Sequence, residues 1–366
     1  MQRALIVKLG AIGDVVMALP AVHALSQQGF QIDWVASHQA AAVLQLYPFV
    51  RVIEADERAI LQGAPLAKLS ALRSVWKQLT GPYDLVAALY YDWRYRLLSL
   101  PVRTSRHVQL SHEDRAVRLL PGRHHTDEFA RILLGSVSLH AADGGPEPTS
   151  LSPLAPVGLP VSPLPPPSGT RVVLAAGGAK NLLRDDLLRR WPVESYAALG
   201  RMLVAAGHEV VLTGGPGDTW VRKAFEGMPC TDLIDRLSLP QLLAVFDGSD
   251  AVVTHDSGPL HLAGVTSCAL LGIFGPVDPR MRLPRRPGAM ALWGGESFAC
   301  RPCYDGSRYA NCSDNQCMAE ITPGLAFDAL KELLNREQSG EPAAFEVRAP
   351  VLQGSLISIG GVAEPA

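Results

Sequence analysis

The sequence predicts an α/β protein with two doubly wound halves, each built on a parallel sheet. Three observations predict it. Apolar strands alternate with helices in the N-terminal part, the same alternation restarts after residue 170, and a proline-rich run separates the two parts. Alternating strands and helices are typical of a parallel sheet with helices on both faces. A chain of 366 residues can form two domains, each with its own core.

In the first part, the apolar run 4–7 predicts a strand, and residues 15–26 predict the helix that follows it. The short aliphatic runs that predict the next strands are 31–36, 50–53 and 83–89. A further helix is expected to begin at residues 124–128. We therefore expect an N-terminal Rossmann-like domain at residues 1–145.

A proline-rich run at residues 146–169 cannot be helical and is interpreted as a linker. The second part predicts strands at 171–175 and 208–213 and helices at 193–206 and 240–246. These elements indicate a second Rossmann-like domain at 170–335, and a C-terminal extension at 336–366 has no readable role apart from a β-like run at 355–359. Two such domains are expected to face a cleft, the usual place for a ligand.

The most informative motif lies between residues 250 and 278. The apolar run at 252–253 ends in Thr-His-Asp-Ser-Gly-Pro, residues 260–264 then predict a helix, and 269–274 predict a second strand. Backbone N–H groups at the start of a helix bind anions. The motif therefore predicts a phosphate-sized site in the C-terminal half, and an ordinary capped helix is the alternative.

The loop after the first strand reads Lys-Leu-Gly-Ala-Ile-Gly-Asp at residues 8–14. A dinucleotide fingerprint requires glycine at positions 8, 10 and 13, and position 8 is a lysine. An NAD-dependent oxidoreductase is therefore disfavoured. What remains is a glycine-lined turn with Asp14 at a helix start, which is either a catalytic carboxylate or an acid favoured by the helix dipole.

Two further glycine turns follow predicted strands. Residues 175–192 contain Lys180, Arg189 and Arg190, which would each suit a diphosphate or a solvated surface. Residues 213–218 end in Asp218, which would accept ribose hydroxyls.

Taken together, these segments resemble glycosyltransferase family 9, the ADP-heptose heptosyltransferases. The resemblance runs from about residue 4 to 330 through KLGAIGDVVMALPAVHAL, GGAKN with RRWPVESYAAL, VVLTGGPGD, and DSGPLHLAG with FGPVDP. It implies the GT-B fold, with the acceptor bound mainly by the first domain and the nucleotide sugar by the second. It also implies an inverting transfer that uses ADP-heptose and no catalytic metal.

The resemblance places the catalytic base on Asp14. The donor and diphosphate contacts expected from the motifs and the resemblance are Gly178, Lys180, Asn181, Arg189, Arg190, Asp218, Asp256, Ser257, Gly258 and His261. Asp256 and His261 would alternatively order the loop. The family often has lysine before Trp-Pro, where this chain has Arg189 and Arg190 after an insert at 181–188.

The acceptor site is predicted from charge. Seven arginines lie between residues 94 and 123 against two acids, which indicates either a basic site or a solvated surface. The expected acceptor contacts are Gly13, Arg94, Arg96 and His125. The phosphorylated core of lipopolysaccharide is the first acceptor hypothesis, and a serine of an autotransporter adhesin is the second.

Four cysteines form a second motif at Cys300, Cys303, Cys312 and Cys317. This spacing is typical of a tetrahedral structural zinc or iron site, and free or disulfide-bonded pairs are the alternative. The resemblance includes a branch that glycosylates adhesins and holds iron with such cysteines in a ring assembly. A bound metal would therefore favour the protein acceptor and a homo-oligomer.

Composition and charge exclude some classes of function and location. The net charge of −2 argues against general nucleic-acid binding, and no apolar run has the length of a membrane span. The apolar run 4–7 is too short for a signal peptide, so we expect a cytoplasmic protein, with peripheral contact at the inner face of the inner membrane. An inactive binding module is disfavoured by the intact Asp14 and the Asp-Ser-Gly-Pro loop.

Overall fold

The computed structural model describes residues 2–135, 151–180, 182–304, 308–339 and 346–348. The chain divides into two compact units, Met1–Gly158 (unit 1) and Leu159–Ala366 (unit 2). The division falls inside the proline-rich run, whose described residues 151–168 contain neither helix nor strand. The predicted run at 355–359 lies outside the described residues.

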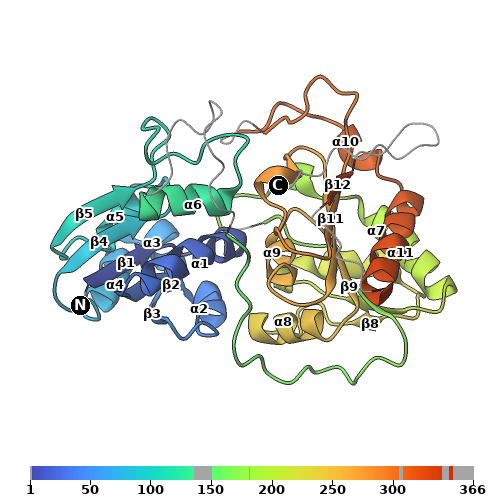
Figure 1. Ribbon diagram of the computed structural model, residues 1–366, viewed down its shortest axis with the longest axis horizontal. Helices are drawn as coiled ribbons and strands as arrows, with labels where there is room; N and C mark the ends of the chain where they lie inside the picture. The colour runs from blue at the N-terminus through green and yellow to red at the C-terminus, as the bar shows by residue number, and fades with distance from the viewer. Residues whose placement is uncertain (1, 136–150, 181, 305–307, 340–345, 349–366) are drawn as a thin grey trace. The chain divides into compact units, whose positions relative to one another are not determined.

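Unit 1 contains a parallel sheet with the strand order β3-β2-β1-β4-β5 (Figure 1). Its strands are β1 (Gln2–Val7), β2 (Phe30–Ser37), β3 (Val50–Ala55), β4 (Tyr83–Ala88) and β5 (Thr104–Gln109). Its helices are α1 (Ile12–Gln27), α2 (His38–Leu44), α3 (Glu57–Gln62), α4 (Pro65–Trp76), α5 (Arg94–Leu97) and α6 (His125–Leu134). The predicted strands and the first helix are confirmed, and α1 begins three residues earlier than predicted, at Ile12.

The central position of β1 explains its sequence. Ala4 to Val7 are fully buried, because both faces of a parallel sheet are covered by helices. α1 and α6 lie side by side (Figure 1). The helix that follows β1 is therefore packed against a second helix.

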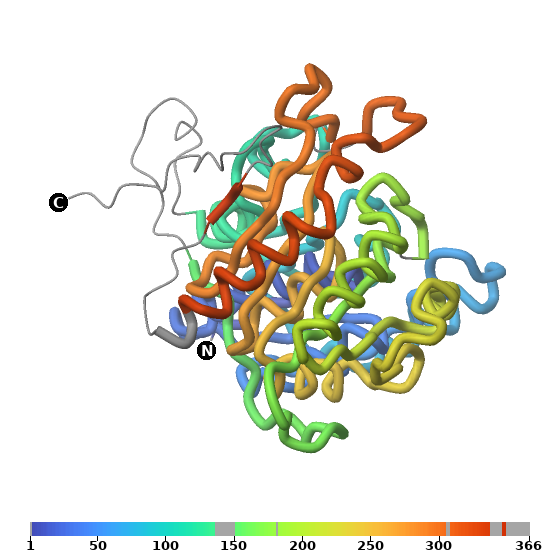
Figure 2. Tube along the Cα trace, turned by 90° about the vertical axis from the view of Figure 1, so that its right-hand side faces the viewer, coloured from blue at the N-terminus to red at the C-terminus, as the bar shows by residue number. Residues whose placement is uncertain are grey.

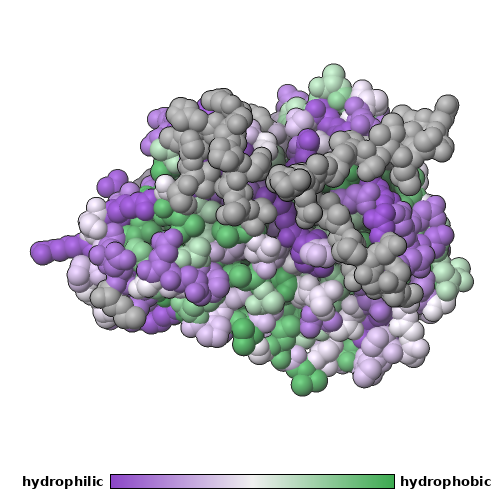
Figure 3. Space-filling view, in the orientation of Figure 1, coloured by the Kyte–Doolittle hydropathy of each residue, from purple (hydrophilic) through white to green (hydrophobic). Residues whose placement is uncertain are grey.

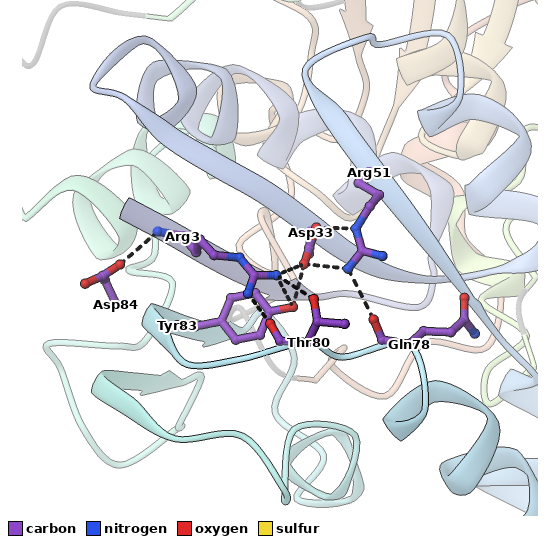
Figure 4. A network of polar contacts seen from close by, with 7 residues as sticks. All are labelled: Arg3, Asp33, Arg51, Gln78, Thr80, Tyr83 and Asp84. Carbon is purple, nitrogen blue, oxygen red and sulfur yellow. Dashed lines mark hydrogen bonds and ion pairs between the residues drawn. The ribbon is translucent and has the colours of Figure 1, made fainter. Parts of the chain in front are cut away.

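A polar network joins the first four strands of unit 1 through the buried carboxylate of Asp33 (Figure 4). Arg51 donates from Nε to Asp33 Oδ1 at 2.7 Å, and Nη2 of Arg3 lies 2.9 Å from Oδ2. The hydroxyl of Tyr83 also donates to Oδ2. Arg3, Arg51 and Tyr83 lie at or near the first residue of their strands, which is the edge opposite the carboxyl ends. The network therefore ties the strands together away from the usual ligand edge.

Unit 2 contains a second parallel sheet, in the order β12-β11-β10-β9-β6-β7-β8. Its strands are β6 (Arg171–Ala175), β7 (Glu209–Leu212), β8 (Thr231–Asp232), β9 (Ala251–His255), β10 (Ala269–Phe274), β11 (Ala289–Trp293) and β12 (Glu346–Arg348). Its α-helices are α7 (Val193–Ala205), α8 (Leu239–Asp247), α9 (Gly258–Ala263), α10 (Gln316–Ala319) and α11 (Pro323–Ser339). Figure 2 shows α11 beside the strands of this sheet, and α11 contacts β10 and α7.

The two parallel sheets confirm the α/β fold class. Among the elements that the sequence analysis did not predict are β5, β11 and α11, although β11 is a buried apolar run and α11 buries residues at helical spacing. None of the helices in the described ranges is long and apolar enough to cross a membrane. The face drawn in Figure 3 mixes hydrophilic and hydrophobic residues.

Candidate functional site

Three loops of unit 2 leave neighbouring strands at the same edge of the sheet. β6 lies between β9 and β7, with Ala175 paired to Thr254 and Leu174 paired to Leu212. The loops after these strands carry the glycine turns at 177–178 and 214–215 and the motif at 256–258. Parallel α/β sheets bind ligands at this carboxyl edge.

Asp218 connects the two glycine turns. Its Oδ1 accepts the N–H of Gly178 at 2.8 Å, and its Oδ2 accepts the N–H of Gly215 at 2.8 Å. A Cβ atom on Gly177 would lie 2.2 Å from Asp218 Cγ, so position 177 requires glycine. In this structure Asp218 holds the loops through their backbone, and its predicted contact with a ribose stays a prediction.

Gly178 lies directly against Ser257. Gly178 has a φ of +90°, and a Cβ there would lie 3.2 Å from Ser257 Oγ. Ser257 is buried, and its Oγ has no hydrogen-bond partner among the described residues. A buried hydroxyl without a partner is unfavourable, so a ligand atom at this point would stabilise it.

Asp256 is a buried acid surrounded by cations. Nη1 of Arg189 lies 3.4 Å from Asp256 Oδ2, and Nη1 of Arg282 lies 3.6 Å from the same atom. Burial raises the pKa of Asp256, but Arg282, Arg189 and His261 outweigh it and hold the pKa below its usual value. Asp256 Oδ1 has no hydrogen-bond partner among the described residues. The group is therefore an ionised carboxylate with acceptor capacity left.

The basic residues of the loop after β6 have different surroundings. Arg189 also pairs with Asp186 at 2.7 Å, whereas Arg190 donates to the carbonyl of Gly178 at 2.9 Å and pairs with Asp185. Lys180 is 62% exposed and lies 3.3 Å from Asp185. Arg189 therefore points into the buried cluster, Arg190 orients the glycine turn, and Lys180 faces solvent. Asn181 lies outside the described residues.

Two residues of this cluster were missed by the sequence reasoning. Arg282 follows β10, and its guanidinium lies 5.4 Å from the ring centroid of Tyr304. His255, the last residue of β9, is fully buried and contacts the Tyr196 hydroxyl at 3.1 Å. Burial, with Arg189 nearby, lowers the pKa of His255 to about 3, so it is neutral. An arginine soon after a strand end in FGPVDPRMR was the available signal for Arg282.

In unit 1, Asp14 lies in the first turn of α1 and is paired with Lys8. Nζ of Lys8 lies 2.8 Å from Asp14 Oδ2, with side-chain exposures of 1% and 28%. From the sequence, Lys8 was interpreted only as the residue that stands where a dinucleotide fingerprint needs its first glycine. Opposite charges at positions 8 and 14, on either side of one glycine turn, were the signal that this interpretation left unused.

Further groups surround this turn. Nζ of Lys8 lies 4.6 Å from the ring centroid of Tyr90, and a Cβ atom on Gly10 would lie 3.3 Å from Glu57 Oε1. Burial raises the pKa of Glu57, and the charge of Lys8 opposes that shift. Gly13 is buried in α1. Asp14 therefore belongs to a polar cluster inside unit 1.

The residues predicted to bind the acceptor, and the arginines near them, differ in their burial and in their partners. Arg94 donates from Nε to Asp92 at 2.9 Å, and Nε of Arg123 lies 2.6 Å from the buried carboxylate of Glu128. Arg96 is exposed, whereas His125 is buried in the first turn of α6. Part of the predicted basic surface therefore neutralises acids of unit 1. The acceptor contacts stay predictions.

The four predicted metal-binding cysteines do not form a ligand set in the described residues. All six cysteines are free, and the described part of the chain has no group of three or more His, Cys, Asp or Glu side chains placed to hold a metal. Burial raises the pKa of Cys317 to about 12, and Cys303, Cys312 and Cys300 contribute to this rise. In the described residues, the four cysteines are therefore not placed as a tetrahedral ligand set.

Comparison with known proteins decides the family of the second unit. Residues 174–312 match the model of glycosyltransferase family 9 (heptosyltransferase). These residues form a glycosyltransferase family 9 domain. The buried cluster around Asp256, the Asp218 contacts and Arg282 all lie inside this family 9 domain.

Relatives with curated names agree with this family. Lipooligosaccharide heptosyltransferase 2 of Haemophilus influenzae is 30% identical over 155 residues, 40% of this chain and 43% of that protein. The chain thus spans less than half the length of this relative. Lipopolysaccharide heptosyltransferase 1 of Escherichia coli is 24% identical over 312 residues, 82% of this chain and 93% of that protein.

Solved structures show the fold over both units. ADP-heptose lipopolysaccharide heptosyltransferase II of Escherichia coli superposes with a TM-score of 0.69 at 20% identity, covering 92% of this chain and 100% of that one. The iron-containing dodecameric glycosyltransferase TibC of Escherichia coli gives a TM-score of 0.58 at 14% identity, covering 92% and 77%. The chain therefore has the two-domain GT-B fold that the resemblance implied.

Proposed function

We propose that the protein transfers a heptose from ADP-heptose to a hydroxyl of the lipopolysaccharide core, with inversion at the anomeric carbon. The family 9 match over the residues that hold the Asp256 cluster is the observation that carries this proposal. The names of the relatives supply the heptose and the lipopolysaccharide acceptor.

In the proposed reaction, the acceptor oxygen attacks the anomeric carbon while the bond from that carbon to the diphosphate breaks. The acceptor proton passes to Asp14, and ADP leaves with the electron pair of the broken bond. A positioned general base contributes about 10²- to 10⁴-fold to such a step. Arg189, with the backbone N–H groups at Ser257 and Gly258, would stabilise the charge that develops on ADP.

Several contacts support the donor assignment in unit 2. Two buried atoms have no hydrogen-bond partner among the described residues: Ser257 Oγ, which can donate to a phosphate oxygen, and Asp256 Oδ1, which can accept from a sugar hydroxyl. The glycine turn at 177–178 leaves no room for side chains beside Asp218 and Ser257. Lys180, Arg190 and His261 are proposed as further donor contacts, and Gly13, Arg94, Arg96 and His125 as acceptor contacts.

The first experiment is calorimetry with ADP, ADP-heptose, UDP, GDP and NAD, followed by transfer to heptose-deficient lipopolysaccharide. We expect the protein to bind ADP and ADP-heptose and to transfer heptose. Asp14→Asn should lower the rate of transfer by at least about 10²-fold and keep the affinity for ADP. Binding of NAD alone would contradict the proposal. A variant that keeps a tenth of the turnover would remove Asp14 as the base.

A second candidate keeps the chemistry and changes the acceptor to a serine of an autotransporter adhesin. The cysteine segment favours it, since it carries four cysteines at a spacing typical of a metal site, and TibC, a structural neighbour, is iron-containing. Cys300, Cys303, Cys312 and Cys317 would then hold a structural iron or zinc after a local rearrangement. With four protein ligands this metal would have no open position for catalysis.

Metal analysis of the purified protein tests this candidate. One iron or zinc per chain, lost in Cys303→Ser and kept in Cys268→Ser, would favour it, because Cys268 is buried elsewhere. A metal-free protein that is active on lipopolysaccharide would exclude it. In either case we propose action in the cytoplasm, with peripheral contact at the inner membrane for a lipid-linked acceptor.

A further inference from the structure

Lys8 is a buried lysine in contact with the acid at the start of α1. Its side chain is 1% exposed, and Nζ donates to Asp14 Oδ2 at 2.8 Å. The ammonium also lies 4.6 Å from the ring centroid of Tyr90. An ammonium group is buried at high cost unless an anion pairs with it. The contact with the half-buried Asp14 therefore compensates the buried charge of Lys8.

The backbone fixes both ends of this contact. Lys8 follows β1 directly, its N–H donates to Val35 O at 3.1 Å, and its carbonyl accepts the Trp34 indole N–H at 3.1 Å. Asp14 lies in the first turn of α1. A functional group on rigid elements is held more accurately than one on a free loop.

A second carboxyl lies near the same ammonium. The charge of Lys8 acts on Glu57, whose carboxyl lies against Gly10. Lys8 thus balances two acids in one cluster, and the hydrogen bond goes to Asp14. A point charge with three donors suits this shared position.

We propose that Lys8 is a positioning residue for Asp14, because its ammonium holds one carboxylate oxygen so that the carboxylate keeps the orientation that proton transfer requires. This inference rests on the proposed function. The acceptor proton still passes to Asp14, and Lys8 keeps its own protons throughout. A small misplacement of a reacting group costs about 10²-fold in rate, which sets the expected effect.

The test is a kinetic double-mutant cycle with Lys8→Met and Asp14→Asn in the full chain. We expect Lys8→Met to lower kcat by about 10²-fold, with little change in the acceptor KM or in ADP affinity. The double variant should be no slower than Asp14→Asn alone, since Lys8 acts through Asp14. Lys77→Met is the control, because Lys77 is an exposed lysine of the same unit. If Lys8→Met does not fold, Lys8→Gln keeps an N–H donor and replaces it.

Two results would overturn the inference: an unchanged kcat, with or without a raised acceptor KM, or rate losses that multiply in the double variant. A wild-type protein that transfers no heptose would instead reject the proposed function. In that case, the thermal midpoints of the wild type, the two single variants and the double variant test whether Lys8 and Asp14 interact. A combined shift smaller than the sum of the single shifts supports the pair, and additive shifts overturn it.

Discussion

Nη1 of Arg189 lies 3.4 Å from Oδ2 of Asp256, so a side chain from the loop after β6 reaches the buried acid after β9. The sequence distance between them is large, but β6 and β9 are neighbours in the sheet. Arg282 approaches the same oxygen from the loop after β10. Loops from three strands therefore meet at one carboxylate.

Asp256→Asn should destabilise the protein in a pH-dependent way. The folded pKa of Asp256 lies below its usual value, so its stabilising effect is present above the unfolded pKa of about 3.9 and is lost as pH falls through the folded pKa. Breaking a buried pair costs about 3 kcal/mol, so we expect a loss near this size at pH 7. Urea unfolding between pH 7 and pH 3 measures it.

The wild type and Asp256→Asn should converge in stability toward the acid end of that series. Asp247→Asn is the matched control, because Asp247 is exposed and accepts the N–H of Ser267. An equal loss at all pH values would show that the charge of Asp256 is not what stabilises the loops.

Arg282→Met should weaken ADP binding by about tenfold, since a charge-assisted contact to a diphosphate contributes roughly 1.4 kcal/mol or more. The ADP affinity of Arg282→Lys should lie between those of the wild type and Arg282→Met, because lysine keeps the charge but not the planar guanidinium group. Calorimetric titration with ADP measures both. Arg280→Met is the control, because Arg280 is 58% exposed and pairs with Asp278. Equal affinities for Arg282→Met and Arg280→Met would remove Arg282 from the donor site.

Asp218→Ala should loosen both glycine turns. The change leaves the N–H groups of Gly178 and Gly215 without their acceptor; because Gly178 is only partly buried and Gly215 is exposed, we expect a cost of about 1 kcal/mol, at the low end of that for a buried group. We expect a lower thermal midpoint and weaker ADP binding than for Glu226→Ala, an exposed acid of the same unit. A lower affinity with an unchanged midpoint would indicate a direct ribose contact in place of the clamp.

Asp33→Asn should destabilise unit 1 without involving the candidate site (Figure 4). Arg51 and Tyr83 hydrogen bonds, with the charges of Arg51 and Arg3, lower the pKa of Asp33 against the effect of burial. Because the Arg51 side chain is 51% exposed, we expect a loss of about 1–3 kcal/mol, less than for a fully buried pair.

The stabilisation by Asp33 is present above its unfolded pKa and is lost as pH falls through the lower folded value. Chemical unfolding at pH 7 and at pH 3 measures this loss. Asp84→Asn is the comparison, because Asp84 accepts the backbone N–H of Arg3 from an exposed position. Similar losses for both variants would contradict a special role for Asp33.

The two α/β halves, the strand-to-glycine-turn motifs and the family resemblance could be predicted from the sequence alone. These features are local, because a buried strand, a glycine turn and a helix start each leave a signal within a few residues. Asp14, Asp218, Asp256 and Ser257 were proposed as site residues for that reason, and their roles stay predictions. Even so, the pattern did not separate Arg189, which enters the cluster, from Arg190, which holds the Gly178 carbonyl.

Which charged side chains meet depends on the tertiary structure. Lys8 with Asp14, and Arg282 with Asp256, are contacts between residues whose spacing follows no helix or strand period. The four cysteines show the reverse case, since regular spacing did not produce a metal-ligand group in the described residues. Sheet order brings distant loops to one edge, and side-chain direction at that edge depends on packing that a linear pattern does not encode.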